Sequence, residues 1–355
     1  MLQKTFFVLL SLLIVGCGGT STDNSDTNMS SMSLEGEPYY GQQWYLHYER
    51  IFYAQNNIDP NAHINGANLL QTHSGKGVKI AIIDDGLDVT HEDLEGAIIN
   101  TYDANTKTTN VAHSTSCGFH GTAVTGIIGA RVNNKGIHGI ASSSSIIFLK
   151  YKAFMSESET IELFSKAEEF GADIINCSWG TNDVSQPVKE KIQDLAINGR
   201  GGKGTIIVFA AGNSNQDTGN DESSIPEVIS VGATDKDNLR SWYSNYGVHL
   251  DVMAPGGSEL GITTLDNMYQ KGLATKDENY ILYNDSYPFI GTSASAPIIS
   301  GVIALILEQK PYSTREDIEI ILQQSSDKIG DIPYVNGRND FYGYGKINLA
   351  NILAR

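Results

Sequence analysis

The feature that most constrains this chain is an alternation, from Lys76 onward, between short apolar runs rich in β-branched residues and longer segments with helical periodicity. Consecutive parallel strands need a crossover between them, usually a helix, so this pattern predicts an α/β fold, a mainly parallel sheet with helices on both faces. We expect strands at residues 78–83, 146–149, 174–177, 205–210 and 228–231, and helices at residues 121–130, 157–170, 188–198, 294–308 and 313–324.

The N-terminus has the pattern of an export signal. After Lys4, the apolar run Thr5–Val15 is too short to span a bilayer, which takes about 20 residues. The tetrapeptide at residues 14–17 resembles a bacterial lipobox, in which Cys17 is acylated and becomes the first mature residue. An ordinary cleaved secretory signal is the alternative. The lipobox predicts an extracytoplasmic lipoprotein, anchored in a membrane on its periplasmic or cell-surface side.

Three segments follow from this pattern. Residues 1–16 are predicted to be the lipoprotein signal peptide, and residues 17–36 the lipidated cysteine with a flexible tether. The tether is rich in Ser, Thr, Asn and Asp, and such a segment cannot bury enough apolar surface to order itself. Residues 37–355 show no internal repeat and are predicted to form one folded domain.

The formal net charge of -17 argues against nucleic acid or an anionic membrane surface as the main partner, because phosphate binding calls for clustered Lys and Arg. A basic polypeptide would be attracted instead. The chain has three cysteines. With Cys17 assigned to the lipid, Cys117 and Cys177 remain, and they could form a disulfide in an oxidising compartment. We expect two largely buried free thiols.

Polar residues gather at the ends of the predicted strands. Asp84 and Asp85 end the first strand, residues 178–183 follow the third, and Asn213 follows the fourth. In an open parallel sheet, ligands bind beyond the carboxyl ends of the strands. The functional site is therefore expected at this edge of the sheet.

Four of the polar residues fit the requirements of acyl transfer. A serine hydroxyl is a weak nucleophile, so it needs a base, a carboxylate that orients the base, and donors for the developing oxyanion. Ser293 precedes an apolar helical run, His120 begins another, and Asp84 ends a buried strand. Asn213 offers an amide donor. Each motif alone is more often an ordinary turn or cap, but the chain order Asp, His, Ser is one of the known triad orders.

Together these motifs resemble the subtilisin-like serine peptidases, and within them the kexin and furin branch. The resemblance extends from about Glu37 to Ala350. It implies a subtilisin-like α/β domain at residues 37–355 and a serine endopeptidase that works through an acyl-enzyme on polypeptide substrates. The alternatives are an inactive protease-like binding module and a broad-specificity subtilisin. The motifs that carry it are Gln42–Leu46, Asp84–Asp88, Cys177–Gly180, Ser241–Ser244 and Gly291–Pro297.

The resemblance also implies where a substrate would bind. An extended substrate would lie along Ser178, Trp179 and Gly180, where main-chain hydrogen bonds give affinity and pockets give preference. Asp183 falls where kexin-like enzymes place an acid at the bottom of the primary pocket, which would select Arg or Lys; a solvated loop aspartate is the alternative. Asp85 matches the acid that meets a second basic residue. Its expected neighbour is replaced here by Cys117, so strict dibasic selectivity does not follow.

A bound calcium ion is the other implication of the resemblance. Glu37, Asp93 and Asn134, with carbonyls near Val132 and Ile137, match an oxygen-rich site that pins the N-terminal segment in these enzymes, and such ligands suit Ca²⁺. A plain turn is the alternative. Family members are usually made with a folding prodomain, and only a short tether precedes Glu37 here. Folding is therefore expected to depend on a separate chaperone or on metal.

Overall fold

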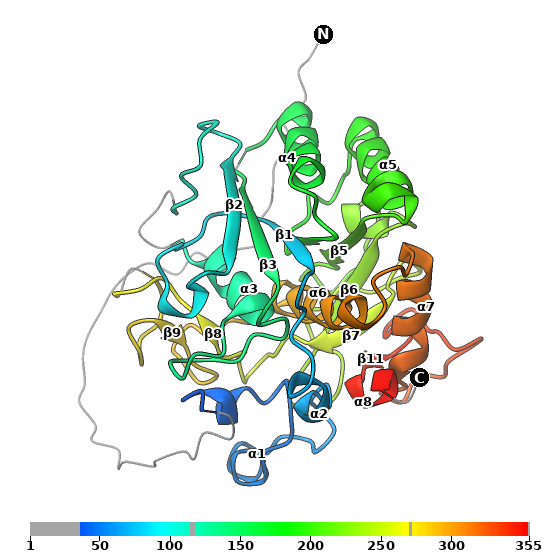
Figure 1. Cartoon of the computed structure of the whole chain (residues 1–355). Coiled ribbons are helices and arrows are strands. Elements are labelled where there is room, and N and C mark those ends of the chain that lie inside the picture. Colours follow the sequence, from blue (N-terminus) through cyan, green and yellow to red (C-terminus); the bar gives the residue numbers. More distant parts are fainter. Residues whose placement is uncertain (1–35, 114–117, 153, 270–271, 354–355) are drawn as a thin grey trace.

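A nine-stranded sheet crosses the centre of the computed structural model, which describes residues 36–113, 118–152, 154–269 and 272–353 (Figure 1). The strand order is β10-β11-β7-β6-β5-β4-β1-β3-β2, and all pairings except β10–β11 are parallel. The strands are β1 (Lys79–Asp84), β2 (Ile98–Asp103), β3 (Ser145–Lys150), β4 (Ile174–Cys177), β5 (Ile206–Ala210), β6 (Ile229–Thr234), β7 (Val252–Pro255), β10 (Ser326–Asp327) and β11 (Lys346–Ile347).

The order of the strands reverses at β1. This strand pairs with β3 on one side and with β4 on the other, so the connections beyond its carboxyl end diverge. Such a reversal leaves a crevice at the edge of a parallel sheet, which is where ligands bind in folds of this kind. Asp84 is the last residue of β1 and lies at this point.

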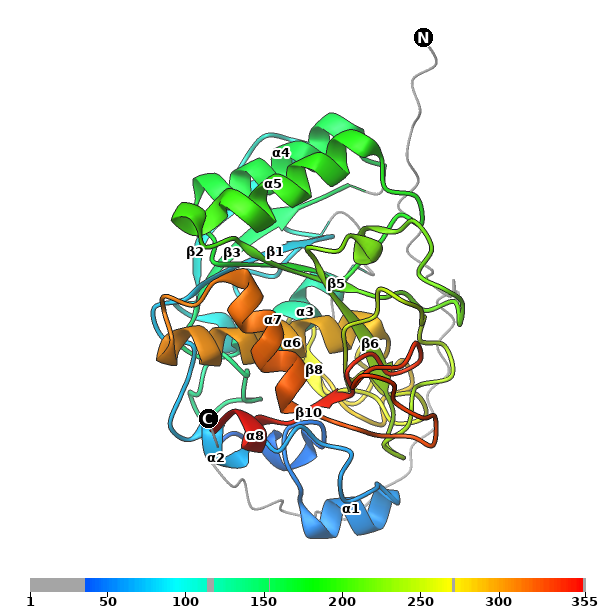
Figure 2. The ribbon, with the colours of Figure 1, turned by 90° about the vertical axis from the view of Figure 1, so that its right-hand side faces the viewer.

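Helices cover both faces of the sheet (Figure 2). On one face α4 and α5 pack against Ile83, Leu149 and Phe209, while the apolar helices α3 and α6 cover the opposite face. Although α6 is long and apolar enough to cross a membrane, it is almost wholly buried, as expected for a core helix. The helices are α1 (Arg50–Asn56), α2 (Ala67–Leu70), α3 (His120–Gly129), α4 (Glu157–Glu169), α5 (Gln186–Gly202), α6 (Thr292–Gln309), α7 (Arg315–Ser325) and α8 (Leu349–Leu353), with short 3-10 turns at Tyr40–Gln42, Glu92–Leu94 and Glu222–Ser224.

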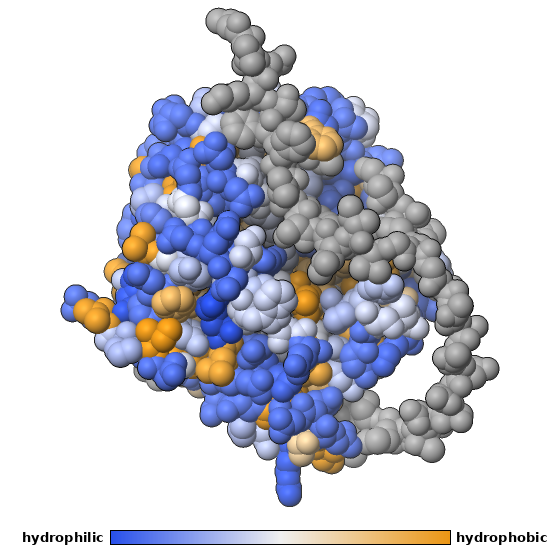
Figure 3. Space-filling view, turned by 180° about the vertical axis from the view of Figure 1, so that it is seen from behind, coloured by the Kyte–Doolittle hydropathy of each residue, from blue (hydrophilic) through white to orange (hydrophobic). Residues whose placement is uncertain are grey.

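A separate two-stranded hairpin lies beside α3. Its strands are β8 (Thr264–Leu265) and β9 (Tyr280–Ile281), which pair antiparallel. Seen from behind, the molecular surface is mostly hydrophilic, and its hydrophobic residues form small separate groups (Figure 3). This surface agrees with the acidic composition of the chain.

The predicted α/β architecture is confirmed. Each of the five predicted strands overlaps β1, β3, β4, β5 or β6, and each of the five predicted helices overlaps α3, α4, α5, α6 or α7. The prediction missed β2, β7, β10, β11, the hairpin and the short helices α1, α2 and α8. The edge strand β2 has mixed burial and therefore lacks a continuous apolar run. The strands of the hairpin have two residues each, which is too short to show a period.

Candidate active site

The structure brings Asp84 and His120 into direct contact. Asp84 Oδ1 lies 2.8 Å from His120 Nδ1, and the same oxygen accepts the backbone N–H of Asp85 at 2.8 Å. Asp84 is fully buried at the end of β1, and His120 is the first residue of α3. The carboxylate thereby fixes the ring so that Nε2 is left for proton transfer. The ring of Phe289, which sequence reasoning missed, packs edge-on against the imidazole at 5.6 Å.

Ser293 is the second residue of α6. The first backbone N–H groups of a helix have no partner within the helix, and the positive end of the helix dipole lies there. Gly291, the N-cap residue, has φ of 129°, a conformation that L side chains rarely adopt. Glycine is therefore required at the turn that presents Ser293. Ser293 and His120 are each 9% exposed, so both reach the surface through a narrow opening.

The hydroxyl of Ser293 donates to the backbone oxygen of Ser178 at 3.0 Å. In return, the hydroxyl of Ser178 donates to the backbone oxygen of Ser293 at 3.0 Å. In the described part of the chain, no hydrogen bond joins Ser293 to His120. Rotation about χ1 of Ser293 would redirect its hydroxyl, and catalytic hydrogen bonds commonly tighten only when substrate is bound. Ser178, which follows β4, is thus adjacent to the nucleophile, as expected.

Asn213 lies beside the same turn of the chain. Its Oδ1 accepts the backbone N–H of Thr292 at 2.9 Å and the hydroxyl of Thr292 at 3.0 Å. The amide group is therefore held with Nδ2 free to donate. A Cβ atom on Gly291 would lie 3.3 Å from Nδ2, so the donor faces the turn that carries Ser293. Thr292 was not predicted as a site residue, although it belongs to the quoted Gly291–Pro297 motif.

The charges of the site favour a basic imidazole. Burial lowers the pKa of His120, but the charge of Asp84 and its hydrogen bond outweigh burial, so the pKa is raised above its usual value. Burial raises the pKa of Asp84, and His120 opposes that shift. Burial by itself would also raise the pKa of Asp85. His113, His120 and the N–H of Gly121 lower this pKa by more, so it lies below its usual value. Asp85 is therefore ionised beside the triad, where its carboxylate accepts the Gly121 N–H at 2.9 Å.

The segment at residues 178–182 forms a wall next to the nucleophile. Trp179 is buried and donates its indole N–H to the backbone oxygen of Ile83 at 2.9 Å, which fixes the wall to β1. Of the two interpretations of Asp183, a buried acid of the primary pocket and a solvated loop aspartate, the structure shows the second. Asp183 is exposed, and its carboxylate accepts the amide of Asn220 at 2.8 Å, because the chain turns outward at Asn182, where φ is 62°.

Two buried acids lie behind this wall instead. Asp221 is 6% exposed, and its carboxylate is so close to Gly180 that a Cβ atom there would lie 2.5 Å from Oδ2. Glu222 is 1% exposed and accepts the N–H and hydroxyl of Thr181 at 2.9 and 2.7 Å. Burial and the charge of Asp221 raise the pKa of Glu222 to about 7. Sequence reasoning missed both acids, and no local pattern marks them.

The candidate calcium ligands lie at the N-terminal segment. Glu37 is fully buried, and its two carboxylate oxygens accept the backbone N–H groups of residues 133–136 at 2.6 to 3.1 Å. Asp93 Oδ2 accepts the N–H of Ile137 at 3.1 Å. Burial and the charge of Glu37 raise the pKa of Asp93 to about 7. Glu37 and Asp93 thus lie close together, and it is the N–H of Ile137 that contacts Asp93, whereas a carbonyl ligand near Ile137 stays a prediction.

The amide that shares this site belongs to Asn133 and not to Asn134. Asn134 has φ of 63° and an exposed side chain, whose Oδ1 lies next to Gly36. Val132 is also half exposed. The side-chain oxygens Asp93 Oδ1 and Asn133 Oδ1 are buried without a hydrogen-bond partner. Unpartnered buried oxygens next to a second carboxylate fit a hard cation such as Ca²⁺.

Comparison with known proteins agrees with this geometry. Residues 75–345 match the model of the Subtilase family. The chain belongs to this family. The subtilase is 34% identical over 319 residues to the "Calcium-dependent protease" of Trichormus variabilis, covering 81% of this chain and 48% of that protein. It is 29% identical over 342 residues to the "Dibasic-processing endoprotease" of Yarrowia lipolytica, covering 89% of this chain and 33% of that protein.

The subtilisin-like fold of this subtilase is also found among solved structures. The serine protease of Aeromonas sobria, solved in complex with "the chaperone (ORF2)", superposes with a TM-score of 0.77 at 20% identity over 90% of this chain and 66% of that chain. The subtilase spans about half the length of the cyanobacterial calcium-dependent proteases that it matches.

The cysteines of the subtilase are described in part. Cys177 is a free, fully buried thiol, as expected, and burial raises its pKa well above the usual value. A thiol with a raised pKa is a poor nucleophile. Cys17 and Cys117 lie outside the described residues, so the predicted lipidation and the state of Cys117 stay predictions.

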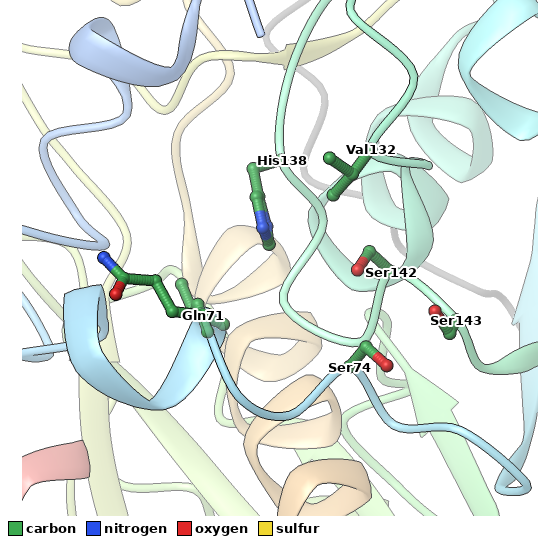
Figure 4. Close-up of a pocket in the computed structure, with 7 residues that line it drawn as sticks. Gln71, Ser74, Val132, His138, Ser142 and Ser143 are labelled. Atoms are coloured by element: carbon green, nitrogen blue, oxygen red, sulfur yellow. The ribbon is translucent and has the colours of Figure 1, made fainter. Parts of the chain in front are cut away.

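A shallow pocket of about 510 Å³ lies elsewhere, between the end of α2 and the chain at residues 132–143 (Figure 4). The ring of His138 points into it, with Gln71 on one side and Val132 and Ser142 on the other. None of the candidate catalytic residues lines this pocket. It is therefore distinct from the active site of the subtilase.

Proposed function

We propose that the chain is a serine endopeptidase. The observation that carries this proposal is that Ser293, in the first turn of α6, is hydrogen-bonded to Ser178 at the end of β4, next to the strand that ends in the Asp84–His120 pair, while Asn213 holds the preceding residue, Thr292. His120 takes the proton of Ser293 through Nε2 as Oγ attacks the substrate carbonyl. Asn213 Nδ2 and the backbone N–H of Ser293 donate to the oxyanion.

Collapse of this intermediate expels the amine, which takes its proton from His120, and leaves an acyl-enzyme on Ser293. Water, deprotonated by the same imidazole, then releases the acid product. The alternative of an inactive binding module is disfavoured because all four catalytic groups are present in this arrangement.

A fluorophosphonate probe tests the proposal, because it labels only an activated serine. We expect wild type to be labelled and Ser293→Ala to be unlabelled, while Ser143→Ala, an exposed serine outside the site, keeps full labelling. Equal labelling of wild type and Ser293→Ala would assign the reactivity to another residue. A folded wild type without labelling would support the binding module.

We propose further that the subtilase prefers to cleave after Arg or Lys. Asp221 and Glu222 are buried acids next to Gly180 and Thr181, two and three residues from Ser178, and the hydrogen bonds described for their carboxylates come from neutral N–H and hydroxyl groups. Buried charges are normally paired, so a basic side chain entering from the substrate would supply the missing partner. The likeness to a dibasic-processing endoprotease and the kexin-like motifs support this assignment, and Asp85 would meet a second basic residue. A broad-specificity subtilisin remains the alternative.

Calcium binding is proposed for the cluster at the N-terminal segment. Glu37, Asp93 and Asn133 would hold the ion, with carbonyl oxygens near Val132 and Ile137. Bound there, Ca²⁺ would tie the N-terminal segment to the core and neutralise two buried carboxylates. The similarity to proteins named calcium-dependent proteases supports this proposal.

We also propose that the chain is anchored to a membrane through a lipid. The lipobox supports acylation of Cys17 and an extracytoplasmic, membrane-anchored protein with the tether at residues 17–36. Undiminished incorporation of labelled palmitate after Cys17→Ser would rule the anchor out.

A separate helper is proposed to assist folding, because a structural neighbour was solved with a chaperone. Denatured protein diluted into calcium buffer should regain little fluorophosphonate labelling without a helper. Full recovery would show that the chain folds unaided.

A further inference from the structure

The β8–β9 hairpin is fixed to the catalytic helix by its inner strand. The hydroxyl of Thr264 donates to the backbone oxygen of Ala123 at 2.6 Å, and the hydroxyl of Thr122 donates to Asn267 Oδ1 at 2.8 Å. Leu265 packs so closely that a Cβ atom on Gly126 would lie 2.4 Å from its Cγ. The hairpin thus lies beside α3 (Figure 1) and contacts it two to six residues after His120.

The outer strand of the hairpin carries Tyr280, which faces the candidate calcium site. Tyr280 is 3% exposed, and its ring packs edge-on against His91 at 5.3 Å and in a tilted arrangement against Tyr39 at 5.2 Å. A Cβ atom on Gly136 would lie 2.2 Å from the tyrosine ring. Position 136, in the loop that encloses Glu37, therefore has to be glycine for Tyr280 to pack there.

The hydroxyl of Tyr280 reaches the acids of this cluster. It donates to Glu92 Oε1 at 3.3 Å and lies within the electrostatic influence of Asp93. Burial and the charges of Asp93 and Glu92 raise the pKa of Tyr280 far above its usual value, so the hydroxyl keeps its proton and donates.

Neighbouring residues make parallel connections. Asn279 contributes its backbone oxygen, 3.0 Å from His91 Nε2, and its amide, which donates to Glu92 at 3.4 Å. Tyr39, in the N-terminal segment, donates to Asp277 at 2.5 Å. The cluster therefore contacts the chain of the hairpin at three positions, Asp277, Asn279 and Tyr280.

We infer that Tyr280 is a positioning residue that couples occupancy of the Glu37–Asp93 site to the β8–β9 hairpin and, through α3, to His120. This inference rests on the proposed calcium site and the proposed peptidase activity. A two-stranded hairpin is marginally stable by itself, so its order depends on what it contacts. Asp93 is buried next to the charge of Glu37, and two neighbouring carboxylates repel each other unless a cation neutralises them. Loss of the ion would loosen the surface that holds Tyr280.

Phe289 completes the connection to the imidazole. The backbone N–H of Ile262, at the start of the hairpin segment, donates to the backbone oxygen of Phe289 at 2.9 Å, and the Phe289 ring packs on His120. The imidazole is thus supported by the hairpin from two directions, through α3 and through Phe289.

Hydrogen exchange with and without Ca²⁺ tests the inference in wild type, in Tyr280→Phe and in Tyr312→Phe, a matched control at a site 85% exposed. In wild type and the control, Ca²⁺ should slow exchange both in the loop at residues 133–137 and in the hairpin at residues 264–268. In Tyr280→Phe the loop should still respond, whereas the hairpin response should be largely lost. Peptide hydrolysis should show kcat lowered roughly tenfold with KM little changed, as for a lost hydrogen bond to a charged group.

The outcomes separate the inference from the proposals beneath it. A hairpin response that survives in Tyr280→Phe overturns the coupling and leaves the calcium site intact. If Ca²⁺ changes hydrogen exchange in wild type neither in the loop nor in the hairpin, both the calcium site and the coupling are overturned. Fluorophosphonate labelling still tests the peptidase activity separately. A lower kcat at unchanged KM in Tyr280→Phe, without any change in the hydrogen exchange of the hairpin, also contradicts the inference.

Discussion

The side-chain oxygen of Asn213 accepts both the N–H and the hydroxyl of Thr292, the residue immediately before Ser293. Because the amide oxygen is occupied, the orientation of the amide is fixed before any substrate arrives. Preorganised donors of this kind stabilise an oxyanion without reorganising during the reaction. The arrangement makes Asn213 a residue whose loss should affect turnover more than substrate binding.

Replacing Asn213 with Leu should lower kcat by roughly 100- to 1000-fold, the cost found for removing such a donor in subtilisin, with KM little changed. Steady-state hydrolysis of a peptide substrate measures both constants. Asn198→Ala, an exposed asparagine on α5, serves as the control and should behave as wild type. A raised KM with normal kcat would mean that Asn213 binds the ground state and is not an oxyanion donor.

The pH dependence of hydrolysis should report the Asp84–His120 pair. The imidazole must be neutral to accept a proton, so kcat/KM should fall as the pH drops through the pKa of His120, which Asp84 raises above its usual value. In Asp84→Asn the raising charge is gone, and the acidic limb should move to lower pH while kcat falls about 10⁴-fold. Profiles between about pH 5 and pH 9 would show this. If the acidic limb lies at the same pH in Asp84→Asn as in wild type, His120 is not the base that titrates.

A feature could be predicted from the sequence when the pattern that marks it lies within a short stretch of residues. Strands β1, β3, β4, β5 and β6 are buried on both faces, so their apolar runs are visible in the sequence. The triad was predictable because each member sits in a short motif at a strand end or a helix start.

Features that depend on tertiary contacts were not predictable in this way. Whether Asn133 or Asn134 turns inward depends on one backbone angle, and Asp183 points outward for the same kind of reason. Asp221 and Glu222 are buried by tertiary contact with the segment at residues 178–182, and no local sequence pattern marks them as buried. Tyr280 acquires its role only from segments nearly 190 residues away along the chain, such as Glu92.

The two buried acids near the primary pocket and the exposed Asp183 make different predictions. Asp221→Asn keeps an oxygen that can accept the Asn182 N–H, so the segment at residues 178–182 should keep its conformation. The substitution removes the buried charge. The ratio of kcat/KM for Arg over Leu before the cut should fall by roughly 10- to 100-fold. Glu222→Gln should act in the same direction, and Asp183→Asn should leave the ratio nearly unchanged because Asp183 is exposed. If Leu peptides already outrun Arg peptides in wild type, the basic preference is wrong.

Calcium should stabilise the folded chain by mass action. An ion at about 100 times its Kd adds about 2.7 kcal/mol, which for a domain of this size corresponds to a rise in Tm of roughly 5 °C. Thermal unfolding in chelator and in millimolar Ca²⁺ should show this difference in wild type and in Asp237→Asn, a control with an exposed carboxylate. Asp93→Asn removes a charged ligand and should abolish the difference, because Asn133 alone cannot replace a carboxylate for a hard cation. An unchanged calcium response in Asp93→Asn would place the ion elsewhere, since Asp93 Oδ1 is the carboxylate oxygen that the site leaves without a partner.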